Sequence, residues 1–266
     1  MSDRPFLVEL HCHTASSHDG LMTLASLVAA ARAVGLDAVA ITDHDTVEGA
    51  LEFRRRAREQ GESLAIIVGE EKTLDDGSHF IGLFLERPIE SGDLAGAVAE
   101  IAGQGGICLV PHPFRRKDGL LRNGLGPLRV LEGCGAAFEL FSAKCSAAEN
   151  ARAAELLGGA GLVPFGGSDA HYESDLGECV NEVPRAGDVE ASVRAMLAGR
   201  TPYRILGKPQ AAGAAERSYA PLYYRVKRFV ALPKLLVPAA RQAYRRYRNL
   251  RLGVGPKPLR ELYRHA

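Results

Sequence analysis

The sequence predicts an α/β fold in which short buried strands alternate with helices. Seven short runs of apolar residues have the length of strands, and most are continuous rather than alternating, as in a parallel sheet covered on both faces. Segments with helical periodicity separate most of these runs, so the alternation favours an α/β barrel or an open sheet. The chain has 266 residues, of which 46% are hydrophobic and 24% charged. This composition excludes collagen-like, disordered and disulfide-scaffold proteins.

The elements can be assigned in chain order from apolar runs, periodicity and turn residues. The predicted strands are 7–11, 37–42, 64–69, 79–85, 107–110, 136–140 and 162–166. The predicted helices are 24–34, 47–60, 93–103, 147–157 and 188–198. Thr23 is a favourable N-cap for the first helix, and Gly35 a favourable residue at its C-terminal end. The Asp-Gly pair within residues 73–79 favours a hairpin between the third and fourth strands.

Charge divides the chain into two parts. Residues 201–266 hold 15 of the 33 Lys and Arg, only 2 of the 32 Asp and Glu, and seven of the eight tyrosines. We therefore predict a barrel-sized domain over residues 1–205 and a basic, tyrosine-rich C-terminal extension over 206–266. Three roles for the extension stay open. It can be solvated or packed on the domain, or its residues 222–266 can contact nucleic acid or an anionic membrane surface.

The cysteines and the apolar runs bear on location. No run approaches the ~18 apolar residues of a spanning helix, so no transmembrane segment is predicted, and the first residues do not resemble a secretory signal. The five cysteines are odd in number and form no CxxC, which suits reduced thiols. We predict a cytoplasmic protein, with peripheral membrane association as an alternative.

Histidines and carboxylates cluster where the predicted strands end. His11 and His13 end the first strand, and alternate residues of a strand share a face, so both imidazoles can reach one ion. The other strand ends carry Asp43, His44, Glu70, His112, Glu139, Asp169 and His171. The carboxyl ends of strands are where α/β folds place their sites, and imidazole and carboxylate are ligands of divalent transition metals. The sequence therefore predicts a metal centre.

Taken together, the motifs HxHT…DG, TDHDT, GEE, PHP and SDAH resemble those of the PHP family, named for polymerase and histidinol phosphatase. They occur in the family's order over about residues 7–175. The resemblance implies a distorted, TIM-like (β/α)7 barrel, two or three divalent ions (Mn, Zn or Fe) and hydrolysis of phosphoesters. It assigns His11, His13, Glu70 and Asp169 to the first ion, Glu70 and His112 to the second, and Asp19, His44 and His171 to the third.

Two ligand positions stay open. The family's second ion has a further ligand after the sixth strand, often His and sometimes Cys, and Cys145 in FELFSAKCS takes that place. A plain buried cysteine is an equal alternative there, with Glu139 as the fallback ligand or as a residue that orients one. The chain has SHDG where the family is nearer SDG, so either His18 or Asp19 can face the metal. Asp19 is favoured because its Asp-Gly pair matches the family, which leaves His18 as a rim residue and proton donor.

The expected enzyme is a metal-dependent phosphoric ester hydrolase. A metal-activated hydroxide would attack the phosphorus of a small phosphorylated metabolite or nucleotide. Arg115, three residues after His112, is expected to grip the phosphate with its guanidinium, although a solvated loop arginine is the alternative. With His44 and His171 it forms the predicted catalytic set. Two alternative functions are an exonuclease-like phosphodiesterase, whose extension guides RNA or DNA ends, and a non-catalytic metal-binding module.

Overall fold

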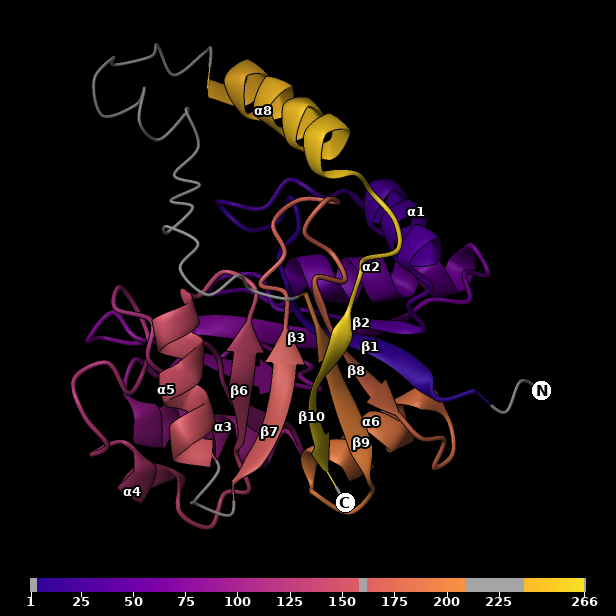
Figure 1. The fold of residues 1–266 in the computed structure, drawn as a ribbon. Coiled ribbons are helices and arrows are strands. Elements are labelled where there is room, and N and C mark those ends of the chain that lie inside the picture. Colours follow the sequence, from indigo (N-terminus) through magenta and orange to yellow (C-terminus); the bar gives the residue numbers. More distant parts are fainter. Residues whose placement is uncertain (1–3, 158–161, 209–236, 266) are drawn as a thin grey trace.

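The computed structural model describes residues 4–157, 162–208 and 237–265, and it has a mixed α/β fold around one curled sheet (Figure 1). The sheet has ten strands in the order β10-β9-β8-β1-β2-β3-β4-β5-β6-β7. The strands are β1 (Phe6–Cys12), β2 (Ala38–Ile41), β3 (Ala65–Thr73), β4 (His79–Leu83), β5 (Ile107–Val110), β6 (Ala137–Ser142), β7 (Val163–Gly167), β8 (Cys179–Val183), β9 (Tyr203–Gly207) and β10 (Arg260–His265). The seven predicted strands correspond to β1–β7, so the α/β prediction is confirmed.

Five of the described helices follow the five predicted segments, and two further helices are present. The helices are α1 (Leu24–Val34), α2 (Glu48–Glu59), α3 (Leu94–Gly103), α4 (Leu128–Leu131), α5 (Ala147–Leu157), α6 (Val189–Leu197) and α8 (Val237–Leu252). The Thr23 side chain caps α1 by accepting a hydrogen bond from the Ser26 N–H, and the helix ends at Gly35 with a φ of 89°. The four-residue α4 was not predicted, because one turn shows no periodicity.

The sheet is not a regular (β/α)7 repeat. Strands β1, β2 and β3 are parallel, and so are β5, β6 and β7, but β4 runs antiparallel to both β3 and β5. The predicted hairpin joins β3 to β4, and Gly77 in its turn has a φ of 75°, which only glycine adopts without strain. Strands β8, β9 and β10 continue the sheet antiparallel from the other edge of β1.

The curl brings β1 and β7 together at their carboxyl ends, although they are not neighbours in the sheet order. An isolated parallel bridge joins Cys12 to Ala170, just beyond β7. The His13 N–H donates to the Ala170 carbonyl at 2.7 Å, and the Ala170 N–H donates to the His11 carbonyl at 3.2 Å. The chain segments that carry His11, His13 and Asp169 are thereby fixed next to one another.

Two apolar clusters hold the sheet in place. One lies inside the curl and includes Val8, Leu10, Ile67, Ile81, Leu109 and Phe165, together with Val193 and Met196 of α6. The other lies between the outer face of the sheet and the helices, and includes Leu27, Val28, Ile41, Val68 and Ile101. Strand residues thus alternate between inner and outer faces, which determines which side chains at the strand ends point into the curl.

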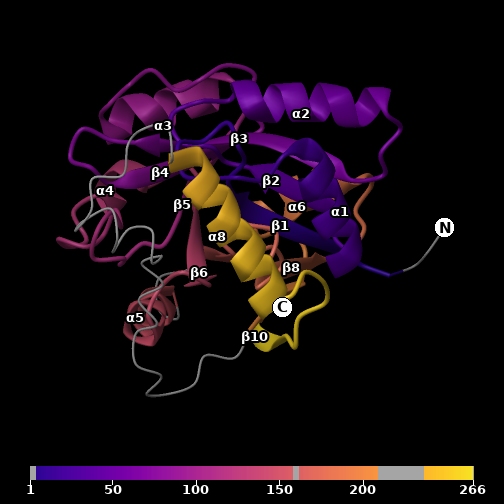
Figure 2. The ribbon, with the colours of Figure 1, turned by 90° about the horizontal axis from the view of Figure 1, so that it is seen from above.

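The described part of the basic extension packs on the rest of the chain. Strand β10 pairs with β9, and α8 crosses over the carboxyl ends of the strands (Figure 2). The predicted boundary after residue 205 falls inside β9 and stays a prediction. Most of the segment 222–238 lies outside the described residues. Among the described helices, none combines the length and apolar character needed to cross a bilayer.

Candidate metal centre

A bulge in β1 directs two histidines into the curl. Glu9 pairs with Val39 and Cys12 with Ile41, so β1 has one residue more than β2 over this stretch. The inner face of β1 therefore continues from Leu10 to His11 rather than to Cys12, which joins the outer cluster. His11 and His13 are both fully buried, and their Nε2 atoms lie 3.3 Å apart. Two imidazoles thus meet at one point, as HxH predicts.

Two carboxylates complete the first group of ligand atoms. Oε2 of Glu71 lies 3.4 Å from His11 Nε2 and 3.2 Å from His13 Nε2. Oδ1 of Asp169 lies 3.7 and 3.3 Å from the same two nitrogens. All four side chains are buried. The group contains the donor set expected for the first ion, except that Glu71 stands where Glu70 was expected.

The structure places Glu70 outside the site, which corrects its predicted position. Successive residues of β3 face opposite sides of the sheet, and Glu71 shares the inner face with Ile67. Glu70 shares the outer face with Val68 and accepts a hydrogen bond from the Ile89 N–H at 2.8 Å. Because both faces of β3 are buried, the GEE motif contains no polar alternation that would show which glutamate points inward.

A second group forms around the other oxygen of Glu71. Its Oε1 lies 2.9 Å from His112 Nε2 and 3.0 Å from His79 Nδ1. Asp118 approaches both histidines, at 3.8 Å from His112 Nδ1 and 4.0 Å from His79 Nδ1. Sequence reasoning missed His79 and Asp118. The available signal for His79 was the period of two in β4, which puts it on the same face as Ile81 and Leu83.

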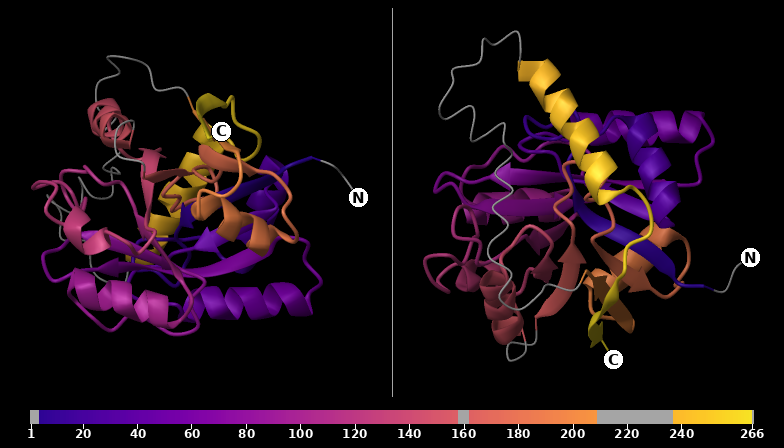
Figure 3. Two further views of the ribbon diagram at one scale, coloured as in Figure 1. Left: turned by 90° about the horizontal axis from the view of Figure 1, so that it is seen from below. Right: turned by 45° about the horizontal axis from the view of Figure 1, so that its top comes forward.

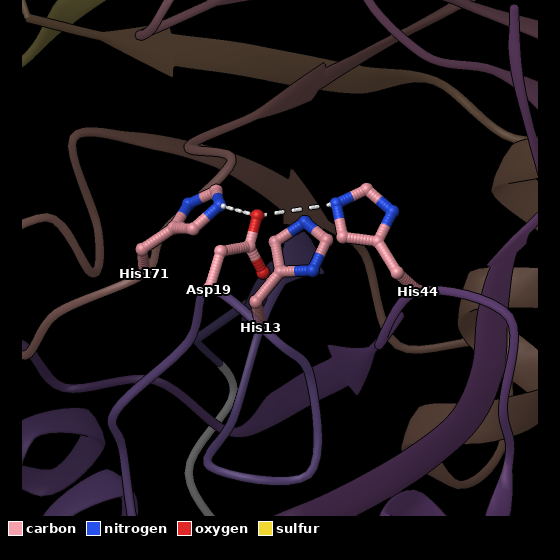
Figure 4. Close-up of side chains that lie close together, drawn as sticks. All are labelled: His13, Asp19, His44 and His171. Carbon is pink, nitrogen blue, oxygen red and sulfur yellow. Dashed lines mark hydrogen bonds and ion pairs between the residues drawn. The ribbon is translucent and has the colours of Figure 1, made fainter. Parts of the chain in front are cut away.

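A third group lies towards the opening, where Asp19 sits between two histidines (Figure 4). Oδ2 of Asp19 is 3.0 Å from His171 Nε2 and 3.3 Å from His44 Nε2, and His13 lies beside them. The His18 side chain is 76% exposed, and its Nε2 is 3.9 Å from Asp19. The structure therefore brings Asp19, His44 and His171 together and leaves His18 at the rim.

Unusual backbone geometry accompanies two of these residues. His112 has a φ of 27° and Asp169 a φ of 49°, a region that residues other than glycine rarely adopt. Gly167 lies against Glu139 and His11, since a Cβ on it would be 2.1 Å from Glu139 Oε1 and 2.9 Å from the Cβ of His11. Strained residues and a close approach that requires glycine are typical of functional sites.

Glu139 and Cys145 occupy different positions relative to the ligand groups. Glu139 accepts from the backbone N–H of His112 at 2.5 Å, and its Oε1 is 3.4 Å from Nδ1 of His11, on the far side of that imidazole from the ligand atoms. This is the arrangement by which a carboxylate orients a metal-binding imidazole. Cys145 is buried but belongs to no ligand group among the described residues. Burial and the nearby Glu139 carboxylate raise the pKa of its thiol, which disfavours a thiolate.

Arg115 lies inside the site rather than in a solvated loop. Its Nε donates to Asp118 and its Nη1 to Asp169, both at 2.5 Å. Although burial would lower the pKa of this guanidinium, the charges of Asp169 and Asp118 raise it well above its usual value. The arginine thus links two carboxylates of different ligand groups.

The charges at the site are strongly coupled. Although burial opposes ionisation, the histidines hold the pKa of Glu71 well below its ordinary value, and His11 and Arg115 do the same for Asp169. Conversely, burial would lower the pKa of His13, but Asp169 and Glu71 raise it to about 10. Without metal, protonation of His11 and His13 therefore balances part of the carboxylate charge, whereas burial and Arg115 lower the pKa of His112. A divalent cation would replace those protons.

The donor set suits divalent transition metals. Five groups of three or four donors, with ligand atoms within 4.8 Å of one another, are formed by His11, His13, Asp19, His44, Glu71, His79, His112, Asp118, Asp169 and His171. Nδ1 of His13, His44 and His112 is buried without a hydrogen-bond partner among the described residues. Imidazole and carboxylate in this number fit Mn²⁺, Fe²⁺ or Zn²⁺ better than Ca²⁺, which takes oxygen ligands.

Comparison with known proteins matches this geometry. The PHP domain model matches residues 9–117, and the PHP-associated model matches residues 147–201. An uncharacterized protein of Methanocaldococcus jannaschii is 31% identical over 117 residues, which are 40% of this chain and 67% of that protein. A 5′-3′ exoribonuclease of Haemophilus influenzae is 35% identical over 82 residues, covering 30% of this chain and 29% of the enzyme.

The fold also occurs in a solved structure. A two-domain protein of Bacteroides vulgatus, described as containing a predicted PHP-like metal-dependent phosphoesterase, superposes with a TM-score of 0.62 at 23% identity. The superposition covers 77% of this chain and 66% of that one. The two family matches include nine of the ten clustered donors, the exception being Asp118. The chain belongs to the PHP family of metal-dependent phosphoesterases.

Proposed function

We propose that the protein hydrolyses a phosphate ester of a small metabolite or nucleotide with the help of two or three divalent ions, Mn, Zn or Fe. The observation that carries the proposal is the convergence of three ligand groups around two shared residues. Glu71 contributes one oxygen to the first group and the other to the second, while His13 lies in both the first and the third. Ions held this close would face one substrate phosphate together.

Each of these three ligand groups would hold one ion. His11, His13, Glu71 and Asp169 would hold the first, Glu71, His79 and His112 the second, and Asp19, His44 and His171 the third. Bound ions would supply Lewis-acid stabilisation of the phosphate and a water acidic enough to ionise near neutral pH. The donors themselves are pre-positioned, because Glu139 and the backbone bridge at Ala170 fix the imidazoles of β1.

Arg115 is the group we assign to the substrate phosphate. Asp118 and Asp169 engage its Nε and Nη1, so the plane of the guanidinium is fixed, and Nη2 is the donor assigned to a phosphoryl oxygen. His44 and His171 line the more open side of the site with Asp19, where the leaving oxygen would depart. The exposed His18 beside them is the candidate proton donor for that oxygen.

The proposed function is tested by measuring phosphate release after the protein is loaded with defined metals. Purified protein is stripped with a chelator, reloaded with Mn²⁺, Fe²⁺ or Zn²⁺, and assayed for phosphate release from a panel of nucleotides, sugar phosphates and phosphodiesters. We expect no release from the stripped protein and release on at least one substrate class after reloading. Full metal loading of folded protein without hydrolysis of any substrate would instead support the non-catalytic metal-binding alternative.

The second candidate is an exonuclease-like phosphodiesterase acting on RNA or DNA ends. The 35% identity to an exoribonuclease over 82 residues favours it, and so do Arg246 and Tyr247, which are exposed on α8 above the site. If α8 guides a strand, Arg246→Gln and Tyr247→Ala should raise KM for a single-stranded oligonucleotide and leave KM for a mononucleotide unchanged. If the variants keep the wild-type KM for both substrates, strand guidance by α8 is contradicted.

We also propose a cytoplasmic location, with peripheral contact to a membrane as the alternative.

A further inference from the structure

Helix α8 contacts the loop that carries two of the site residues. This loop, residues 168–177, follows β7 and includes Asp169 and His171, and α8 lies on the side of the strands' carboxyl ends, as the right-hand view of Figure 3 shows. Nε of Arg245 donates to Glu173 at 3.0 Å, and Nη2 of Arg248 donates to Asp175 at 2.5 Å. Two basic residues of the extension are thus paired with two carboxylates of the loop.

Asn249 and two tyrosines complete this contact. The Asn249 side chain donates to Glu173 at 2.8 Å and accepts from the Ser174 N–H at 3.1 Å. The rings of Tyr172 and Tyr244 meet edge to face with centroids 5.7 Å apart. Four of the six helix positions 244–249, namely 244, 245, 248 and 249, therefore bind the loop, which is more than a single surface ion pair would provide.

Asp175 connects this helix to the site. The carboxylate is fully buried and accepts from Arg248 on α8 and, at 2.6 Å, from Lys144 on the loop after β6. Its Oδ2 also accepts from the backbone N–H of His171 at 3.3 Å. Burial alone would raise the pKa of Asp175, but Lys144 and Arg248 keep it below its usual value, so the acceptor stays charged. The position of the His171 backbone thus depends on a carboxylate that α8 helps to hold.

His171 is also held by contacts that do not involve α8, since its carbonyl accepts from the Leu21 N–H at 3.2 Å and its ring centroid lies 4.4 Å from that of His13. Nδ1 of His171 lies 2.8 Å from the Asp169 carbonyl, which belongs to the same loop, and its Nε2 points to Asp19 at 3.0 Å. A shift of the loop would therefore move His171 and Asp169 together relative to Asp19, His44 and His13. Removing a residue that hydrogen-bonds to a metal ligand and orients it commonly lowers metal affinity by about 10- to 100-fold.

We propose that α8 is a strap that holds the loop 168–177 in metal-binding geometry, with Arg248 as a positioning residue for His171. The inference rests on the proposed metal site, and it concerns a helix that lies outside both segments matched by the family models. It also gives part of the positive charge of the extension a role inside the molecule, since Arg245 and Arg248 pair with Glu173 and Asp175.

The test compares three full-length variants on the same helix. Arg248→Gln removes the charge at Asp175, Arg248→Lys keeps it, and Arg246→Gln changes an exposed arginine as the matched control. Mn²⁺ binding is measured by calorimetry and by counting ions per chain, with circular dichroism as the check on folding. We expect R248Q to weaken the most weakly held ion about 10-fold or more and to leave the tighter ions unchanged. R248K should recover most of the affinity, and R246Q should match the wild type in Mn²⁺ affinity, because strand guidance by Arg246 would not involve the ions.

Amide hydrogen exchange gives a readout that does not require metal. Exchange at residues 171–177 should accelerate in the metal-free R248Q variant and stay at the wild-type rate in R246Q, because only the first change releases the loop. Unchanged ion binding and unchanged exchange in R248Q would overturn the proposal that α8 holds the loop. If R248Q does not fold, the same measurements on Arg245→Gln decide. Failure of the wild type to bind metal would defeat the proposed function, while the exchange result would still decide whether α8 holds the loop.

Discussion

Two neighbouring glutamates on β3 show how little separates a site residue from a structural one. Glu70 and Glu71 are both buried. Glu71 faces five histidines within 3.5 Å, and the histidines hold the pKa of its carboxyl well below the ordinary value, although burial opposes this. Glu70 faces the outer side of the sheet, where burial raises the pKa of its carboxyl to about 7. One step along a strand thus separates an ionised ligand from a carboxyl that tends to be neutral.

His18 and Asp19 form a second pair of this kind. Asp19 lies between His44 and His171, whereas the side chain of His18 extends into solvent. In both pairs the residue types alone are equally suitable for metal, and only the direction of the side chain differs. The difference teaches that backbone geometry, rather than the choice of ligand types, decides which residues form this centre.

The largest effect that would test this comparison is expected at β3. Glu71→Gln keeps the volume but removes the charge shared by two ligand groups, so we expect about a 100-fold or greater loss of Mn²⁺ affinity and of kcat/KM. Glu70→Gln keeps an acceptor for the Ile89 N–H and leaves the inner face unchanged. Calorimetry and phosphate release on both variants measure the contrast. Equal losses in the two variants would show that the faces of β3 are not distinguished in this way.

The pair at the rim should give a smaller effect. Asp19→Asn replaces the carboxylate between His44 and His171 with a neutral amide. We therefore expect loss of one ion per chain and about a 10-fold fall in kcat, with the other ions retained. His18→Gln should leave the ion count unchanged, and it should alter only the alkaline limb of the pH–rate profile if His18 is the proton donor. The ion count comes from mass spectrometry. A lost ion in H18Q, with a full complement in D19N, would reverse the assignment.

The helices and strands could be predicted well from the sequence, but the directions of the site side chains could be predicted only in part. The boundaries of α1 and the strands β1–β7 follow from capping, apolar runs and turn residues, which are local signals. His11 and His13 could be paired because HxH fixes a common face. The choice between Glu70 and Glu71 could not, because β3 is buried on both sides. The β1 bulge, the antiparallel β4 that presents His79, and the return of β10 to the sheet depend on distant contacts that leave no local pattern.

The smallest expected effect is a pH-dependent difference in stability at Glu70. The folded carboxyl has a pKa of about 7 against an ordinary 4.5, so between these values the folded chain holds a proton that the unfolded chain has lost. The neutral Glu70 carboxyl therefore stabilises the folded wild type fully below pH 4.5, and this stabilisation is lost as the pH rises towards 7. Glu70→Gln is neutral throughout and should become more stable than the wild type over this range, by about 1 kcal/mol near pH 7. Urea unfolding of both metal-free proteins between pH 4.5 and 7.5 measures the difference, with the exposed Glu155→Gln as the control. A difference that does not change with pH would mean that Glu70 is ionised in the folded protein, and the contrast between the two faces of β3 would then be one of position without a difference in charge.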